Sequence, residues 1–213
     1  MPPKMENVMG RVALVTGGTR GIGGAISRSL RDAGRDVIAA YAGNEHAAKE
    51  FEENTGIKTI KVDVSDFDQV QEAAAKIKAD MGPIEILVNN AGITRDSTMH
   101  RMSFEQWKEV IDTNLSGVFN CSRAVIEDMR ELSFGRIVNI GSINGQAGQY
   151  GQVNYAATKS GIHGFTKALA QEGAAKGITV NAIAPGYVDT DMVRAVPPDV
   201  LEKIIARIPV GRL

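Results

Sequence analysis

The feature that most constrains the fold is a glycine-rich turn near the N-terminus, set between a strand pattern and a helix pattern. The apolar run Arg11–Thr16 predicts a strand, and Gly21–Ala33 predicts a helix. The turn reads Gly-Gly-Thr-Arg-Gly-Ile-Gly over residues 17–23. Glycine permits tight turns and close backbone approach, and a helix N-terminus offers unpaired N–H groups to an anion. The Gly-x-x-x-Gly-x-Gly spacing differs from the common Gly-x-Gly-x-x-Gly, but the order strand, turn, helix still predicts a cradle for the phosphates of a dinucleotide.

Strand and helix patterns alternate along the rest of the chain. Strands are expected at Arg11–Thr16, Asp36–Tyr41, Lys58–Val62, Ile84–Asn89, Arg136–Ile140 and Thr179–Ala184. Helices are expected at Gly21–Ala33, Glu45–Asn54, Phe67–Met81, Ser103–Glu131 and Asn154–Lys176, the fourth being bent or divided between Asn114 and Gly117. The alternation predicts a single α/β domain with a doubly wound parallel sheet, covered by helices on both faces in a Rossmann-type three-layer α/β/α arrangement. Ligands are then expected beyond the carboxyl ends of the strands.

Length, charge and cysteine content narrow the class of protein. The 213 residues suit one domain over 1–213, with a loose N-terminal segment at 1–9. The 24 Lys and Arg residues balance 25 Asp and Glu residues, and no basic cluster indicates a nucleic-acid partner. No apolar run reaches the roughly 20 residues that a membrane span needs, and no signal peptide is evident. Cys121 is the only cysteine, which excludes an internal disulfide, predicts a packed thiol and suits the cytoplasm; the three histidines lack metal-ligand spacing.

Tyr155 and Lys159 stand four residues apart in a stretch that reads as helix. This spacing places a phenol and an ammonium side by side on one helical face. A neighbouring cation favours the phenolate, so we expect Lys159 to lower the phenol pKa from its usual value of about 10 toward neutrality. Such a tyrosine could protonate a carbonyl oxygen. The alternative is an aromatic core residue followed one turn later by an exposed lysine, because Tyr-x-x-x-Lys also arises by chance.

Polar and glycine-rich clusters follow four of the predicted strands. They are Asp63–Val64, Asn89–Gly92, Gly141–Ser142 and Pro185–Thr190. Each is also what an ordinary turn contains, because Asn, Asp, Ser and Gly favour turns for local reasons. Their common position at one edge of the predicted sheet, together with the phosphate cradle and the Tyr–Lys pair, predicts one ligand site.

With these motifs in this order, the chain resembles the short-chain dehydrogenase/reductase family. The residues that carry the resemblance are Thr16–Gly23, Asn89–Gly92, Asn114, Ser142, Tyr155–Lys159 and Pro185–Gly186, so it extends from Arg11 to about Thr190. Within the family the chain is similar to ketoacyl reductases, especially the acetoacetyl-CoA reductases of polyhydroxyalkanoate synthesis. That closer similarity depends on Asn89–Asp96, Ile111–Leu115, Asn144–Gln152, His163–Glu172 and Ile208–Arg212.

The resemblance implies an NADPH-dependent oxidoreductase that reduces a 3-oxoacyl thioester, foremost acetoacetyl-CoA to (R)-3-hydroxybutyryl-CoA. It implies that Tyr155 is the general acid and that Lys159 lowers its pKa and holds the nicotinamide ribose. Ser142 would hydrogen-bond the same carbonyl oxygen, and Asn114 would anchor a water through which Lys159 exchanges protons. Considered alone, Ser142 is equally well explained as a helix cap, and Asn114 as a kink in the long helix.

The second strand pattern bears on the choice between NADPH and NADH. NAD-selective sites commonly place a carboxylate after this strand, whereas Asp36–Tyr41 is followed by Ala42 and Gly43. Arg20 in the glycine turn offers a cation for a 2′-phosphate, although a solvated loop charge is the alternative. Both features favour NADP(H). The cofactor residues that the resemblance implies are Gly17, Thr19, Arg20, Gly21, Ile22, Gly23, Ala42, Asp63, Val64, Asn90, Ala91, Gly92, Pro185, Gly186 and Thr190.

The resemblance also implies a substrate site and leaves two other functions open. The implied substrate residues are Asp96, Gln149, Tyr150, Gln152 and Tyr187. One alternative is the 3-oxoacyl-[acyl-carrier-protein] reductase of fatty-acid synthesis, which uses two arginines to dock its acidic partner; here one position is Lys176 and the other Ser133, which favours a CoA thioester. The other alternative is a non-catalytic NADP-binding scaffold, which would have no chemical need for a serine, tyrosine and lysine together.

Two further expectations concern the C-terminal region and assembly. Relatives continue beyond the segment that matches Ile208–Arg212 with a helix, a seventh strand and a glycine-rich tail, so we expect this chain to lack the last strand of the family. The resemblance implies a dimer or tetramer in which Ser103–Glu131 and Asn154–Lys176 form a contact. The candidate contact residues are Val118, Phe119, Ile162 and Phe165, for each of which core packing is the alternative.

Overall fold

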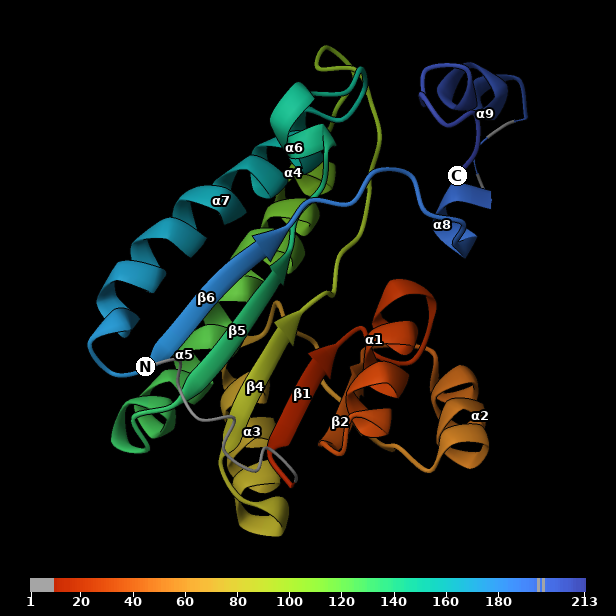
Figure 1. The fold of residues 1–213 in the computed structure, drawn as a ribbon. Helices are drawn as coiled ribbons and strands as arrows, with labels where there is room; N and C mark the ends of the chain where they lie inside the picture. The colour runs from red at the N-terminus through yellow and green to blue at the C-terminus, as the bar shows by residue number, and fades with distance from the viewer. Residues whose placement is uncertain (1–9, 195, 197) are drawn as a thin grey trace.

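Six parallel strands form one sheet in the order β3-β2-β1-β4-β5-β6. The computed structural model describes residues 10–194, 196 and 198–213, so the expected loose segment 1–9 lies outside the described residues. The strands are β1 (Val12–Thr16), β2 (Asp36–Tyr41), β3 (Lys58–Lys61), β4 (Ile84–Asn89), β5 (Gly135–Ile140) and β6 (Ile178–Ile183). Every strand that we predicted is present, and the doubly wound parallel sheet is confirmed (Figure 1).

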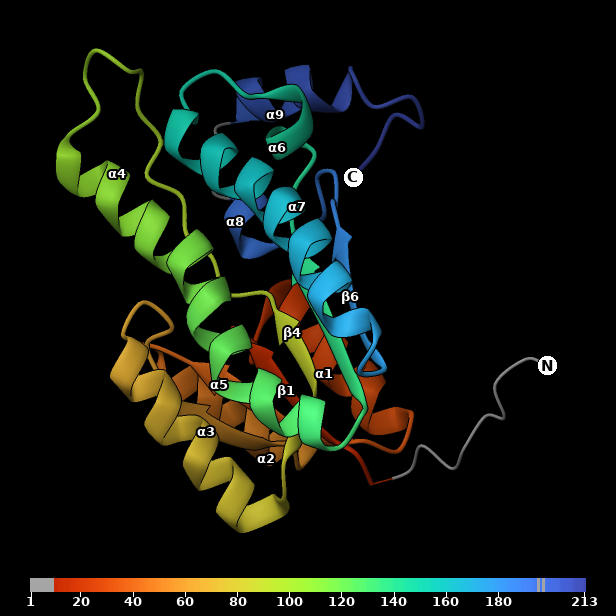
Figure 2. The ribbon, with the colours of Figure 1, turned by 90° about the vertical axis from the view of Figure 1, so that its left-hand side faces the viewer.

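Helices follow the strands in the predicted alternation. They are α1 (Gly21–Asp32), α2 (Glu45–Thr55), α3 (Phe67–Met81), α4 (Phe104–Ile111), α5 (Gly117–Glu131), α6 (Asn144–Ala147), α7 (Val153–Ala174), α8 (Asp191–Arg194) and α9 (Pro198–Ile205). A π-helix, η1 (Asp112–Ser116), separates α4 from α5, so the predicted division of the long helix is confirmed. In Figure 2, α5 continues directly from α4. The short helices α6, α8 and α9 were not predicted, because one or two turns carry too little periodicity to be recognised.

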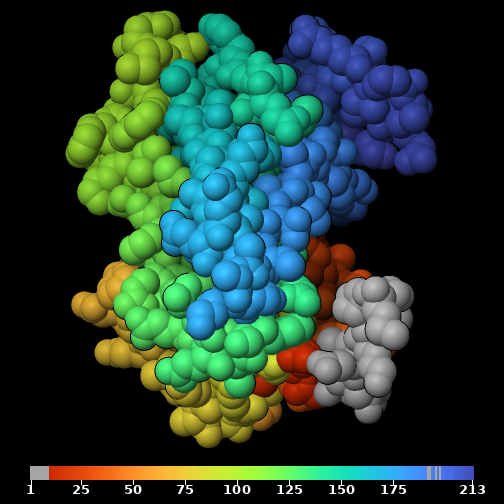
Figure 3. All heavy atoms as spheres, turned by 60° about the vertical axis from the view of Figure 1, so that its left-hand side comes forward, coloured from red at the N-terminus to blue at the C-terminus, as the bar shows by residue number. Residues whose placement is uncertain are grey.

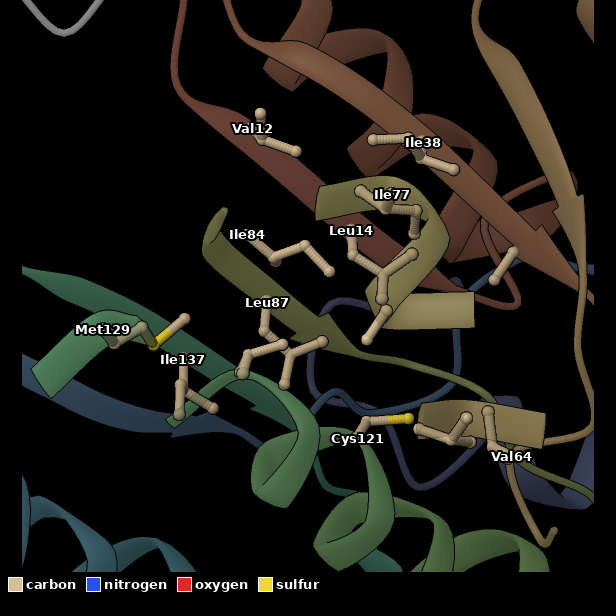
Figure 4. Close-up of a cluster of buried hydrophobic side chains, with 14 of the residues drawn as sticks. Val12, Leu14, Ile38, Val64, Ile77, Ile84, Leu87, Cys121, Met129 and Ile137 are labelled. Atoms are coloured by element: carbon tan, nitrogen blue, oxygen red, sulfur yellow. The ribbon is translucent and has the colours of Figure 1, made fainter. Parts of the chain in front are cut away.

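The core consists of two apolar layers, one on each face of the sheet. All five residues of β1 are buried, as expected for a strand covered on both faces. On one face Leu87 and Ile137 pack against Cys121 and Met129 of α5 (Figure 4). On the other face the sheet packs against Phe51 of α2 and part of α1. The thiol of Cys121 is buried, and this burial raises its pKa to about 12, which confirms a packed rather than a nucleophilic cysteine.

The cover over β6 is one-sided within the described residues. Ile178 and Val180 are buried on the face that α7 covers. Thr179 and Asn181 alternate with them and are exposed, and Ile183 is 53% exposed. The expected three layers therefore hold over the centre of the sheet, whereas β6 is an edge strand with an open second face.

The point where the strand order reverses lies between β1 and β4, and polar side chains join their carboxyl ends. Thr16 Oγ1 accepts hydrogen bonds from the N–H groups of Asn90 (2.9 Å) and Ala91 (3.0 Å). In return, Asn90 Nδ2 donates to the carbonyl oxygens of Thr16 (2.9 Å) and Gly17 (3.1 Å). The glycine turn is thereby fixed against the loop after β4, at the position where open α/β sheets bind their ligands.

Candidate active site

The glycine turn has the geometry of a phosphate cradle. Gly17 and Gly21 have φ angles of +60° and +51°, a region that side chains disfavour. At Gly23 a Cβ atom would lie 2.1 Å from the Gly17 carbonyl oxygen, so only glycine allows this approach. Arg20 caps α1 without a side-chain hydrogen bond, and the first turn of α1 carries no acidic residue. The N-terminus of α1 is therefore suited to an anion, and the residues present fit the pyrophosphate of a dinucleotide.

The expected adenosine residues lie at the carboxyl ends of β2 and β3. Ala42 and Arg20 are exposed. Asp63 Oδ1 accepts from both the N–H (2.9 Å) and the hydroxyl (2.7 Å) of Ser65, which fixes the carboxylate in its loop. Val64 is buried in the core (Figure 4). A ligand at this end would thus meet the backbone of Val64 rather than its side chain.

The loops after β1, β4, β5 and β6 meet at the carboxyl ends of the strands. A Cβ atom on Gly21 would lie 3.7 Å from Thr190 Cγ2, so the last loop reaches the glycine turn. The Pro185 carbonyl oxygen accepts from Ile143 N (3.0 Å), which joins the loops after β5 and β6. At Gly92 a Cβ atom would lie 3.6 Å from Lys159 Nζ. The expected nicotinamide residues are therefore near the expected catalytic ones.

Tyr155 and Lys159 of α7 come together with Ser142, which follows β5, at the carboxyl ends of the strands. Lys159 Nζ lies 5.6 Å from the centre of the Tyr155 ring and donates to the Ile140 carbonyl oxygen at 2.7 Å. The hydroxyl of Ser142 is close enough to Tyr155 to lower the pKa of its phenol. Ser142 and Lys159 are both buried, at 9% and 4% exposure. The arrangement offers a phenol, a hydroxyl and an ammonium to one bound group.

The pKa of Tyr155 differs from our expectation. Burial raises it above its ordinary value, and the Asp96 carboxylate and Tyr187 add to the rise, while the hydrogen bond from Ser142 opposes it. The net direction is opposite to the lowering that we expected, while the lowering that Lys159 itself contributes stays a prediction. The Lys159 ammonium bonds the Ile140 carbonyl oxygen and lies over the Tyr155 ring. Burial also lowers the pKa of Lys159 to about 8.

Asn114 occupies the π-helix η1, and its side chain holds the loop after β4. It is fully buried; its Oδ1 accepts from Ile93 N (2.8 Å) and its Nδ2 donates to the Ile93 carbonyl oxygen (2.9 Å). Single π turns within α-helices often mark functional positions. Because the amide is occupied by Ile93, a water that Asn114 anchors for Lys159 stays a prediction.

The expected substrate residues fall into two groups. Gln152 Nε2 donates to Asp96 Oδ2 at 2.8 Å, and Asp96 and Tyr187 both influence Tyr155 electrostatically. These three therefore lie near the catalytic residues. Gln149 is exposed and Tyr150 is 86% exposed, so both lie at the open tip of the loop before α7.

Three residues that organise the site were missed at the level of sequence. Thr16 joins the two central loops, and Asn144 hydrogen-bonds Gln152 (2.9 Å). Asn154 is fully buried and donates to the carbonyl oxygens of Arg95 (3.0 Å) and Gln106 (3.2 Å). Each stands beside a recognised motif. A polar residue at the end of a buried strand or the start of a helix was the signal that could have identified them.

The part of the chain that the structure describes offers neither a membrane-spanning helix nor a group of metal ligands. In residues 10–194, 196 and 198–213, no helix has the length and apolar character to cross a bilayer. Across the same ranges, His, Cys, Asp and Glu side chains do not gather in groups of three or more that could hold a metal ion.

Known proteins with similar sequences are reductases of 3-oxoacyl thioesters. The acetoacetyl-CoA reductases of Shinella zoogloeoides and Rhizobium meliloti are each 63% identical over 206 residues, which is 96% of this chain and 86% of theirs. The 3-oxoacyl-[acyl-carrier-protein] reductase of Escherichia coli is 46% identical over 209 residues, or 97% of this chain and 85% of that protein. The family described as short chain dehydrogenase matches residues 11–201. This chain therefore belongs to the short-chain dehydrogenase family, whose members use a nicotinamide cofactor.

Proposed function

We propose that this chain reduces the 3-oxo group of acetoacetyl-CoA to give (R)-3-hydroxybutyryl-CoA, with NADPH, for polyhydroxyalkanoate synthesis. The observation that carries the proposal is the meeting of Tyr155, Ser142 and Lys159 at the carboxyl ends of the strands, on the same side of the sheet as the glycine turn. Its substrate class follows from the relatives. Acetoacetyl-CoA reductases are up to 63% identical to this chain, whereas the carrier-protein reductase of Escherichia coli is 46% identical.

Tyr155 acts as the proton donor. Burial raises the pKa of its phenol, so the group is protonated at neutral pH and can donate to the carbonyl oxygen. Ser142, whose hydroxyl is close to Tyr155, donates to the same oxygen and stabilises its developing negative charge. The nicotinamide, when bound, supplies the hydride.

Lys159 supports the charge that the phenol oxygen gains as it releases its proton. Its pKa of about 8 leaves it predominantly an ammonium at neutral pH, in a buried environment where charge interactions are strong. The tie to the Ile140 carbonyl holds this cation beneath the Tyr155 ring. Lys159 also holds the ribose of the nicotinamide. Asn114 anchors a water through which Lys159 regains a proton.

The proposed cofactor residues lie along the carboxyl ends of the strands. Backbone N–H groups at the start of α1 would hold the pyrophosphate, and Asp63 with the backbone of Val64 would flank the adenine. Arg20 is exposed in the glycine turn, and Ala42 follows β2 without a carboxylate that would repel a 2′-phosphate. These two features support NADPH over NADH. Thr190, near Gly21, would meet the nicotinamide.

We also propose that the chain forms a dimer through α5 and α7. A groove of about 450 Å³ lies between these helices, which stand together at the surface in Figure 3. Phe119 (50% exposed) and Phe165 line it, whereas the other two candidates, Val118 and Ile162, are buried in the core and are not available for such a contact. Arg123 and Arg130 of α5 and Glu172 of α7 also line the groove, so two copies related by a two-fold axis can pair opposite charges.

We place the enzyme in the cytoplasm. The support is its single thiol, Cys121, which is free and buried and therefore suits a reducing compartment.

The function is tested by steady-state kinetics with purified protein. We expect NADPH-dependent reduction of acetoacetyl-CoA with a higher kcat/KM than for acetoacetyl-carrier protein, and a lower kcat/KM with NADH. Tyr155→Phe should reduce kcat by about 10²–10⁴-fold, the usual contribution of a general acid, while NADPH affinity measured by fluorescence stays unchanged. Preference for the carrier protein would overturn the substrate, and full activity of the variant would overturn the role of Tyr155.

A further inference from the structure

A chain of hydrogen bonds runs from the loop after β4 to the catalytic hydroxyls. Gln152 Nε2 donates to Asp96 Oδ2 at 2.8 Å, and Gln152 Oε1 accepts from Asn144 Nδ2 at 2.9 Å. The N–H of Asn144 then donates to Ser142 Oγ at 3.1 Å. Ser142 in turn is close enough to Tyr155 to lower the pKa of its phenol, so these bonds connect an exposed carboxylate with the hydroxyl beside the proton donor.

The segments that these hydrogen bonds join also make other close contacts. Helix α6 sits directly on α7, because a Cβ atom on Gly145 would lie 2.6 Å from the carbonyl carbon of Lys159. The N–H of Ser97 donates to the Gly151 carbonyl oxygen at 2.8 Å, so the loop after β4 also pairs with the loop before α7. Gln152 lies between these two supports, and its amide connects the α6 segment with the loop after β4.

We propose that Gln152 is a positioning residue that fixes the Ser142 hydroxyl against Tyr155. A glutamine amide has one acceptor oxygen and one donor nitrogen, and here both are used, the oxygen by Asn144 and the nitrogen by Asp96. Asn144, held in this way, fills one lone pair of Ser142 Oγ with its N–H. The hydroxyl proton of Ser142 is then free to donate to Tyr155 or to a bound carbonyl oxygen.

The inference rests on the proposed reduction and gives Gln152 a role beyond touching the substrate. A direct substrate contact would chiefly alter KM, whereas a positioning role alters the chemical step. A displacement of about 1 Å in a catalytic group can reduce rate by about 10²-fold. Gln152→Leu has nearly the same size but neither polar end, so it breaks both links of the chain.

The first experiment compares Gln152→Leu with wild type and with Gln146→Leu, an exposed residue of α6. We expect Gln152→Leu to lower kcat by about 10- to 100-fold, with NADPH affinity unchanged. Gln146→Leu should match the wild type. A rise of KM with kcat unchanged would overturn the proposal, because it would make Gln152 a substrate contact only.

Gln152→Glu gives a second, pH-dependent test. The introduced carboxyl would face Asp96 on the loop after β4, with Tyr155 on α7 and Tyr187 on the loop after β6 as the other titratable groups nearby; Arg95 is paired with Glu109. Ionised, it repels Asp96; protonated, it donates to Asp96 and still accepts from Asn144. We expect the kcat of this variant, relative to wild type, to recover as pH falls from 8 to 5.5. An unchanging ratio would refute the positioning role.

A third readout does not depend on turnover. Loss of the Gln152 links should speed amide hydrogen exchange in segments 94–98 and 142–152 of the cofactor-free protein, and Gln146→Leu should not. If hydrogen exchange in Gln152→Leu equals that of the wild type, Gln152 does not hold these two segments together, even if activity falls. If the wild type does not reduce acetoacetyl-CoA, the proposed function fails by itself, while hydrogen exchange still decides whether Gln152 holds the two segments together.

Discussion

The buried ammonium of Lys159 makes this chain less stable at neutral pH than its packing alone would allow. The pKa of Lys159 falls from its ordinary 10.5 to about 8, because its surroundings favour the neutral amine. Each pH unit of difference is worth about 1.4 kcal/mol, so the ammonium costs about 3 kcal/mol at pH 7. Lys159→Met removes this cost, but it also removes the donor to the Ile140 carbonyl, which offsets the gain by about 1–3 kcal/mol.

The sign of the pH dependence is the sharper test. Between about pH 8 and pH 10.5 the folded protein binds fewer protons than the unfolded chain, so the stability of the wild type rises with pH through this window. Lys159→Met lacks the titrating amine, so its free energy of unfolding has no such contribution. The stability of Lys159→Met relative to wild type should therefore fall by about 3 kcal/mol between pH 7 and pH 10.5.

Urea unfolding at 25 °C over this pH range measures the difference, since the other titrating groups are common to both proteins. The control is Lys167→Met, an exposed lysine on the same helix, which should shift stability by less than about 0.5 kcal/mol at every pH. A difference between Lys159→Met and wild type that does not change with pH would show that the ammonium is not penalised by burial. That result would refute the reasoning.

Two other predictions follow from backbone geometry. Gly23→Ala should weaken NADPH binding by more than about tenfold in fluorescence titration, because its Cβ would lie 2.1 Å from the Gly17 carbonyl oxygen. Gly164→Ala, with nothing within 4 Å, is the matched control, and equal binding by the two variants would contradict the close approach. Ser133→Gly should raise the free energy of unfolding in urea by about 0.5 kcal/mol, because glycine relieves a left-handed backbone. Ser133 has φ 53°, and a loss of stability would show that its side chain contributes more than this strain costs.

The central strands were predictable because their residues are apolar on both faces and need no knowledge of distant partners. Leu87 and Ile137 belong to runs that can only be buried in a covered sheet. The division of the long helix was also predictable, from Asn114 and Gly117. The four-residue spacing of Tyr155 and Lys159, about one helical turn, likewise predicted that they share one face of α7.

The helix faces could not be assigned from the pattern alone. Val118 and Phe119 are adjacent and both apolar, yet the first is 4% and the second 50% exposed. Ile162 and Phe165 differ in the same way, one buried and one lining the groove. Which apolar residue of a helix faces the sheet depends on how α5 and α7 rotate as they pack, and that is a property of the tertiary structure.

The sequence by itself determined the alternation of strands and helices, the glycine turn and the presence of a phenol, a hydroxyl and an ammonium at one edge of the sheet. These depend on local conformation and on spacing within single elements. Only the tertiary structure decided which atoms bond to which. The Lys159 ammonium meets the Ile140 carbonyl, and Gln152 joins Asn144 to Asp96. The direction in which each pKa moves was decided there too, because desolvation depends on what distant segments of the chain bring to the site.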